Sequence, residues 1–71
     1  MHETTLALRG DHITLEALLK ATGLADGSMA RALIGEGVVQ VNGEAETRRG
    51  RKLRVGDVVV LGDNRATVVT P

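Results

Sequence analysis

The sequence predicts an α+β domain in which two short helices pack on a small, curved antiparallel sheet. In the first half, Leu15, Leu18 and Leu19 recur at the spacing of one helical face. In the second half, residues 39 to 41 alternate between apolar and polar, and Asn42-Gly43 follows them directly. Because both residues of that pair tolerate a positive φ, this change of period predicts a tight β-hairpin.

The N-terminal part predicts one strand and one helix. Residues 5 to 9 alternate between polar and apolar side chains, which is typical of a short half-buried strand. Thr14 is a suitable N-cap, and Gly23 can close the C-terminus of a helix over about residues 15 to 22.

A second helix of about two turns should begin near Asp26 or Ser28, either of which can cap it, and end before Gly37. Its apolar stripe consists of Ala30, Leu33 and Ile34. At about 100° per residue, Arg31 falls on the opposite face and should point outward.

The C-terminal half should be antiparallel β structure. A strand returns from the hairpin through Thr47, and turns at residues 55 to 58 and 62 to 64 flank a strand over 58 to 61. A last strand covers residues 66 to 70. The predicted core consists of Leu15, Leu18, Leu19, Leu24, Ala30, Leu33, Ile34, Val39, Val41, Val55 and Val58.

Length and composition indicate one small cytoplasmic domain over residues 1 to 71. The 42% of hydrophobic residues include no Phe, Tyr or Trp, so the core must be aliphatic. The absence of cysteine excludes disulfides and Cys-ligated zinc, and no apolar run approaches the roughly 20 residues that cross a membrane. His2 and His12 have no evident catalytic partner, so we expect no enzyme activity, cofactor or metal.

Charge is distributed very unevenly, although the net charge is zero. Residues 48 to 54, Arg-Arg-Gly-Arg-Lys-Leu-Arg, are called the basic segment below. They hold five of the nine basic residues and no acid, which leaves four basic against nine acidic residues elsewhere. Such a local excess is typical of contact with a polyanion.

Two stretches resemble the S-four-type RNA-binding domain, also called the alpha-L motif. Residues 30 to 43 contain that family's Leu-Ile, two residues, Gly-x-Val-x-Val-Asn-Gly pattern, and residues 53 to 59 are similar to its later turn. The similarity is strongest over residues 13 to 61. Within the family, Glu46-Thr47-Arg48-Arg49 is most similar to the small stand-alone bacterial YbcJ-like proteins.

The resemblance implies a bacterial, ribosome-associated, non-catalytic domain of translation that binds ribosomal or transfer RNA. Arg31 matches a basic position of the motif. Thr14 stands where the family usually has a basic residue before the first helix, and Asp26-Gly27 stands where it has a Ser-Arg pair. These departures remove two of the usual basic groups.

The residue types of the basic segment fit RNA phosphates, because each guanidinium offers a planar fork of donors and neutralised phosphates release counterions. If the segment is extended, Arg48, Lys52 and Arg54 lie on one side and Arg49 and Arg51 on the other, unless Gly50 forms a bulge. The candidate RNA-binding residues are Lys20, Ser28, Arg31, Arg48, Arg49, Arg51, Lys52 and Arg54. Without aromatic side chains for base stacking, structured RNA is the expected ligand, bound by a monomer.

Several alternatives stay open at this point. The basic segment could be a solvated loop whose charges pair with Glu36, Glu44 and Glu46. Lys20 could simply pair with Glu16, and Ser28 could be only a cap. The protein could instead be an adaptor on a ribonucleoprotein. A ubiquitin-like sulfur carrier is disfavoured, because the sequence ends in Val-Thr-Pro instead of the Gly-Gly that such carriers need.

Overall fold

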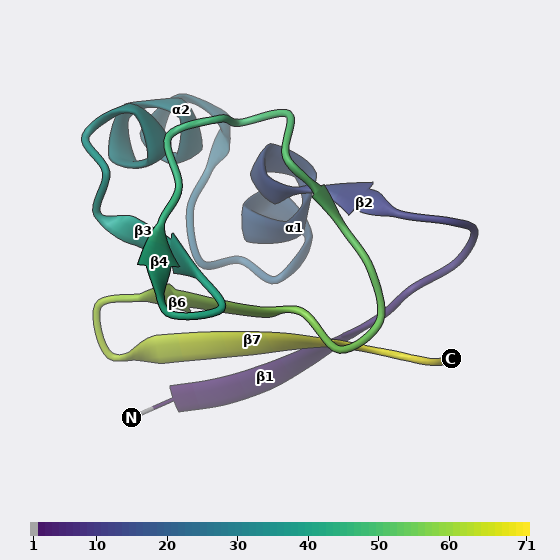
Figure 1. Cartoon of the computed structure of the whole chain (residues 1–71). Coiled ribbons are helices and arrows are strands. Elements are labelled where there is room, and N and C mark those ends of the chain that lie inside the picture. The colour runs from purple at the N-terminus through teal and green to yellow at the C-terminus, as the bar shows by residue number, and fades with distance from the viewer. Residues whose placement is uncertain (1) are drawn as a thin grey trace.

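A mixed sheet of five strands carries both helices on one of its faces (Figure 1). The computed structural model describes residues 2–71. The strand order is β1 (His2–Ala7), β7 (Asn64–Val69), β6 (Val58–Leu61), β3 (Val39–Val41) and β4 (Glu44–Ala45). The α+β class is confirmed. The sheet is not wholly antiparallel, because the first strand joins its edge parallel to the last strand of the chain.

The two helices begin at the predicted caps. In α1 (Leu15–Ala21), the Thr14 hydroxyl accepts a hydrogen bond from the Ala17 N–H at 3.3 Å. In α2 (Gly27–Gly35), the Asp26 carboxylate accepts from the Met29 N–H at 2.9 Å. Ser28 donates its hydroxyl to that same carboxylate at 3.4 Å, so Asp26 is the cap and Ser28 supports it.

A second, two-stranded sheet lies beside the N-terminus of α1 and was not predicted. In it, β2 (Ile13–Thr14) pairs antiparallel with β5 (Lys52–Leu53), with Ile13 opposite Leu53 and Thr14 opposite Lys52. Leu53 is fully buried and Ile13 packs against the core, whereas Lys52 is exposed. One face of this sheet therefore closes the core while the other faces solvent.

The core lies between the helices and the five-stranded sheet. Leu15, Leu18, Leu19, Ala30, Ile34, Val39 and Val41 are buried as predicted. Leu24 and Leu33 are only partly buried at its edge. The prediction is wrong for Val55, which is 51% exposed in a turn, and for Val58, which is half-buried because its neighbour Val59 takes the inward position of the strand. Leu8, Leu53, Val59, Ala66 and Val68 complete the core.

The predicted hairpin is confirmed, with φ of 52° at Asn42 and 87° at Gly43. The returning strand is shorter than predicted, because β4 ends at Ala45 instead of Thr47. The Glu46 backbone still donates to the Val39 carbonyl at 2.9 Å. Beyond Glu46 the chain leaves the sheet and crosses to the helices (Figure 1). Within residues 2–71, no helix has the length and apolar character needed to span a membrane.

Candidate nucleic-acid interface

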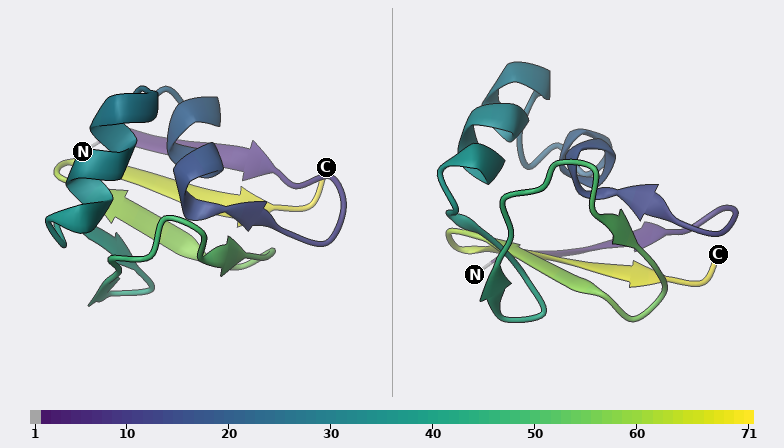
Figure 2. Two further views of the ribbon diagram at one scale, coloured as in Figure 1. Left: turned by 90° about the horizontal axis from the view of Figure 1, so that it is seen from above. Right: turned by 45° about the horizontal axis from the view of Figure 1, so that its top comes forward.

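The basic segment passes over the N-terminus of α1, between α2 and β2 (Figure 2). The first N–H groups of a helix have no partner within that helix. Here the Leu15 N–H donates to the Arg51 carbonyl at 2.9 Å, and the Glu16 N–H donates to the Arg49 carbonyl at 3.1 Å. The backbone of the basic segment is thus fixed on α1, which leaves its side chains to point elsewhere.

The segment begins with a turn and not with extended chain. The Arg51 N–H donates to the Arg48 carbonyl at 3.2 Å, which closes a turn around Arg49 and Gly50. The division predicted for an extended segment, with Arg48 and Arg51 on opposite sides, therefore does not apply to this turn. Both guanidinium groups bind the same carboxylate, that of Glu46. Strand geometry starts only at Lys52.

Glu46 is the buried acid of this region, with only 7% of its surface exposed. It accepts from Arg48 Nε at 3.0 Å, from Arg48 Nη2 at 3.2 Å and from Arg51 Nη1 at 2.7 Å. The Arg48 backbone N–H adds a fourth hydrogen bond at 3.1 Å. Hydrogen bonds from Arg48 and then Arg51 lower the pKa of Glu46 to about 2, and the bond to Glu46 raises the pKa of Arg48. Of the three acids considered as partners, Glu36 and Glu44 make no ion pair within residues 2–71.

A second carboxylate, Glu16 on α1, gathers the basic side chains of the two helices. Arg31 Nε lies 2.9 Å from Glu16 Oε1, and Lys20 Nζ lies 3.6 Å from the same oxygen. The hydrogen bond from Arg31 is the main cause that lowers the pKa of Glu16, and the charges of Lys20 and Arg49 add to it. Arg31 is exposed as predicted, and the predicted pairing of Lys20 with Glu16 is present.

The N-terminus of α2 lies near this cluster. A Cβ placed on Gly27 would sit 3.6 Å from Lys20 Cε, so the first turn of α2 reaches the Lys20 side chain. Ser28 is exposed in that first turn, and its hydroxyl is bonded to Asp26. Among the predicted site residues, Ser28 is the one without a positive charge, and its observed contact belongs to the cap.

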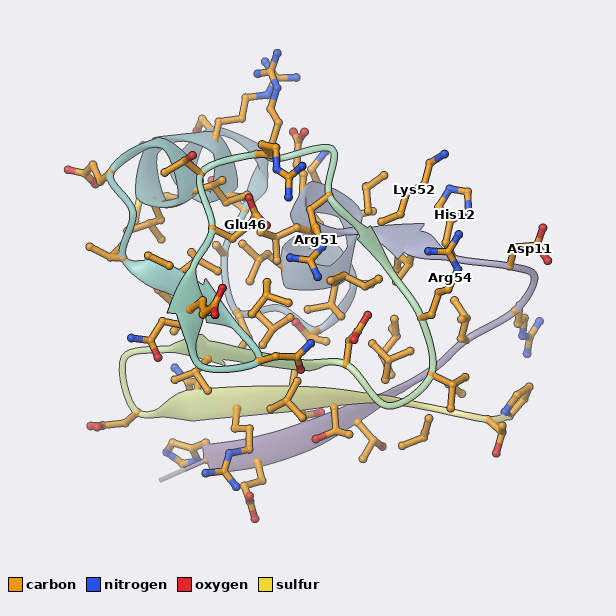
Figure 3. All side chains as sticks on the ribbon, viewed as in Figure 1. Asp11, His12, Glu46, Arg51, Lys52 and Arg54 are labelled. Carbon is orange, nitrogen blue, oxygen red and sulfur yellow. The ribbon has the colours of Figure 1, made fainter. Side chains whose placement is uncertain are left out.

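Three side chains of the basic segment carry no ion pair within residues 2–71: those of Arg49, Lys52 and Arg54. Lys52 on β5 and Arg54, the first residue after that strand, are both exposed and lie near each other (Figure 3). The Arg54 backbone N–H donates to the Asp57 carboxylate at 2.8 Å, whereas its guanidinium extends away from the backbone. These three cations have their donors free for a ligand.

His12, for which the sequence indicates no evident partner, lies beside Lys52 and Arg54 (Figure 3). The β2–β5 register explains this placement. Ile13 pairs with Leu53, and the two strands are antiparallel. His12, which precedes Ile13, therefore lies across from Arg54, which follows Leu53. In the sequence, His12, Ile13 and Thr14 alternate between polar and apolar side chains, but three residues are too short a run to indicate a strand.

The structure thus joins seven basic side chains into one basic surface, a term used below for Lys20, Arg31, Arg48, Arg49, Arg51, Lys52 and Arg54. Two carboxylates, Glu16 and Glu46, lie within it. An open hollow in this surface is lined by Arg48, Gly50, Arg51 and Lys52. Within residues 2–71 no group of acids and histidines has a spacing that could hold a metal ion.

Comparison with known proteins agrees with this architecture. The S4 domain family matches residues 6–69, which is most of the chain. A probable ribosome maturation protein from Bacillus subtilis, RlbA, is 46% identical over 57 residues, a match that covers 79% of this chain and 80% of the relative. On this sequence similarity, together with the helix pair and hairpin described above, the chain belongs to the S4 domain family.

Proposed function

We propose that this protein is a non-catalytic RNA-binding protein that grips the phosphates of structured RNA through the basic surface. The observation that carries the proposal is the segregation of charge. Seven of the nine basic residues lie on the basic surface, where ion pairs within residues 2–71 engage only two carboxylates, those of Glu16 and Glu46. One side of an otherwise acidic molecule can therefore neutralise several phosphates.

The ligand we propose is folded RNA of the ribosomal or transfer RNA class. The chain has no Phe, Tyr or Trp on which unpaired bases could stack. The basic segment is held on α1 by backbone hydrogen bonds, so its cations project from a fixed backbone. Cations on a fixed backbone suit the regular phosphate spacing of an RNA helix better than a flexible single strand. The similarity to a probable ribosome maturation protein supports ribosomal RNA as the first candidate.

His12 extends the same proposed contact area beyond β5. The charged groups around it are Lys52 and Arg54 on the neighbouring strand and Asp11, which precedes it in the chain. An imidazole N–H can donate a hydrogen bond to a phosphate oxygen. We therefore include His12 among the groups that meet RNA.

Crosslinking to RNA in cells, followed by sequencing of the recovered RNA, tests this function without presuming the ligand. Wild-type protein should recover structured ribosomal or transfer RNA. Replacement of Arg49, Lys52 and Arg54 by Gln should reduce the recovery strongly. Arg65→Gln is the matched control, because Arg65 lies on β7 and pairs with Glu3 at 3.0 Å, outside the basic surface.

The second candidate function, an adaptor on a ribonucleoprotein, is separated by the same experiment. An adaptor would bind protein through the basic surface and would keep its partners after nuclease treatment. The RNA-binding proposal predicts that nuclease treatment releases ribosomal components from the immobilised protein. Retention of a protein partner, combined with no RNA crosslink, would refute it.

A further inference from the structure

Glu46 is a carboxylate placed beneath the cations that should meet a polyanion, and this placement needs an explanation. Of the two arginines bound to Glu46, Arg48 has 73% of its side chain exposed and Arg51 has 32%. The acid is buried and the two guanidinium groups lie over it. A negative charge at this position lowers the net charge of the surface, which by itself would weaken attraction to RNA.

The hydrogen-bond pattern leaves most of the arginine donors available. A guanidinium carries five N–H donors. Arg48 commits its Nε and Nη2 groups to Glu46, and Arg51 commits only Nη1. The remaining N–H groups of both side chains are free of Glu46, and both residues line the open hollow with Gly50 and Lys52. The carboxylate can therefore hold the two arginines without occupying the donors that a phosphate would use.

The same carboxylate also fixes the turn from which these side chains project. It accepts the Arg48 backbone N–H at 3.1 Å, and the Arg48 carbonyl accepts the Arg51 N–H at 3.2 Å. Without Glu46, two long side chains and their turn would sample many conformations. Each would then lose that freedom on binding, at a cost in affinity.

We propose that Glu46 is a positioning residue for RNA binding, which holds Arg48 and Arg51 in the arrangement that receives a phosphate group of the RNA backbone. The proposal rests on the proposed function. It assigns to Glu46 a favourable effect on affinity that outweighs its unfavourable charge. Because its pKa is about 2, the carboxylate stays charged at any pH at which RNA binding would be measured.

The test compares two variants that remove the same charge from the same hairpin. Glu46→Gln breaks the contacts to Arg48 and Arg51, whereas Glu44→Gln changes an exposed acid with no ion pair within residues 2–71. Affinity is measured by fluorescence anisotropy with end-labelled transfer RNA as a generic structured RNA. We expect Glu46→Gln to weaken binding about three- to tenfold through the lost preorganisation. Glu44→Gln should leave binding unchanged or strengthen it slightly.

Unchanged or tighter binding by Glu46→Gln would overturn the proposal, because the loss of a negative charge by itself predicts tighter binding to RNA. A core variant, Val59→Ala, controls for general loss of stability. It truncates a fully buried side chain on β6, in the large sheet and outside the basic surface, so while folded it should bind like wild type. Circular dichroism confirms that each variant is folded at the temperature of the binding assay. If Val59→Ala weakens binding as much as Glu46→Gln, the effect is one of stability and the positioning role is refuted.

A measurement without RNA separates this proposal from the proposed function. In the free protein, NMR relaxation of arginine side chains should show Arg48 and Arg51 more ordered than Arg49, which has no ion pair within residues 2–71. Glu46→Gln should remove that difference. Equal mobility of all three side chains in the wild type would refute the positioning role even if RNA binding were demonstrated. Conversely, ordered arginines in a protein that binds no RNA would refute the proposed function alone.

Discussion

The side-chain amide of Asn42 donates a hydrogen bond to the Asp57 carboxylate at 3.0 Å, across a separation of 15 residues. Asn42 Oδ1 in turn accepts from the Val58 N–H at 3.0 Å, and Asp57 accepts from the Arg54 N–H at 2.8 Å. The hairpin turn and the turn that follows the basic segment are therefore bonded to each other. This contact joins Asn42 of the Val-Asn-Gly pattern to Asp57 in the later turn at residues 53 to 59.

Asp57→Ala should lower the free energy of unfolding by about 1–2 kcal/mol, because hydrogen bonds to a charged acceptor are lost at both turns. Urea denaturation followed by far-UV circular dichroism measures this, since the chain has no Tyr or Trp for fluorescence. Asp63→Ala is the control, because the exposed Asp63 side chain makes no hydrogen bond to the described residues. Equal stabilities for the two variants would contradict the structural role of Asp57.

Two glycines with different backbone conformations should respond differently to alanine. Gly43 has a φ of 87°, so Gly43→Ala should cost roughly 1–2 kcal/mol of stability. Gly50, within the basic segment, has no positive φ, and a Cβ there would meet open space. Gly50→Ala should therefore change stability by less than about 0.5 kcal/mol. A large loss for Gly50→Ala would show that the turn at residues 48 to 51 differs from the one described.

The Glu46 ion pairs should make stability depend on pH in acid. The pKa of Glu46 is about 2 in the folded protein, below the ordinary value of 4.5 expected for the unfolded chain. Because this pKa is depressed, the ionised Glu46 carboxylate contributes its full stabilisation of the fold above pH 4.5. That stabilisation disappears as the pH falls toward 2. The difference in unfolding free energy between wild type and Glu46→Gln, measured from pH 7 to pH 2, should shrink along that range. A difference independent of pH would contradict the ion pairs.

His12→Ala should weaken RNA binding, because His12 lies beside Lys52 and Arg54 and its imidazole N–H can donate to a phosphate oxygen. Loss of one hydrogen bond worth about 0.5–1.5 kcal/mol corresponds to a roughly two- to twelvefold loss of affinity. Fluorescence anisotropy with wild type and His12→Ala should show this loss.

His2→Ala provides the control, because His2 is exposed on β1 at the edge of the large sheet, away from the basic surface. This variant should bind RNA like the wild type. If His12→Ala also binds like the wild type, the placement of His12 in the contact area is wrong.

The sequence predicts those parts of the fold that local chemistry determines. Thr14 and Asp26 are N-caps because Thr and Asp side chains accept hydrogen bonds from the first turn of a helix. Asn42-Gly43 forms a tight turn because both residues tolerate a positive φ. The pairing of β2 with β5 depends instead on two residues of each strand meeting across the chain. No periodic signal exists in so short a run. Leu53 was therefore not predicted as a core residue, although it is fully buried.

In the candidate site, too, the sequence predicts what depends on local composition and not what depends on tertiary structure. The basic segment is visible as composition, and its exposure follows from that composition. Which acids neutralise it is a tertiary property. Three glutamates were equally plausible from the sequence, and only Glu46 has its side chain beneath the turn. The convergence of Lys20 and Arg31 on Glu16 likewise depends on how the two helices pack.

The salt dependence of RNA binding tests the central claim most directly, because phosphate contacts release counterions in proportion to their number. With about five phosphates neutralised, log affinity against log salt concentration should fall with a slope of roughly −3 to −4. Replacement of Arg49, Lys52 and Arg54 by Gln should make that slope shallower by about 2, while Arg65→Gln leaves it unchanged. An affinity independent of salt, or a slope that the triple replacement does not alter, would contradict phosphate binding by the basic surface.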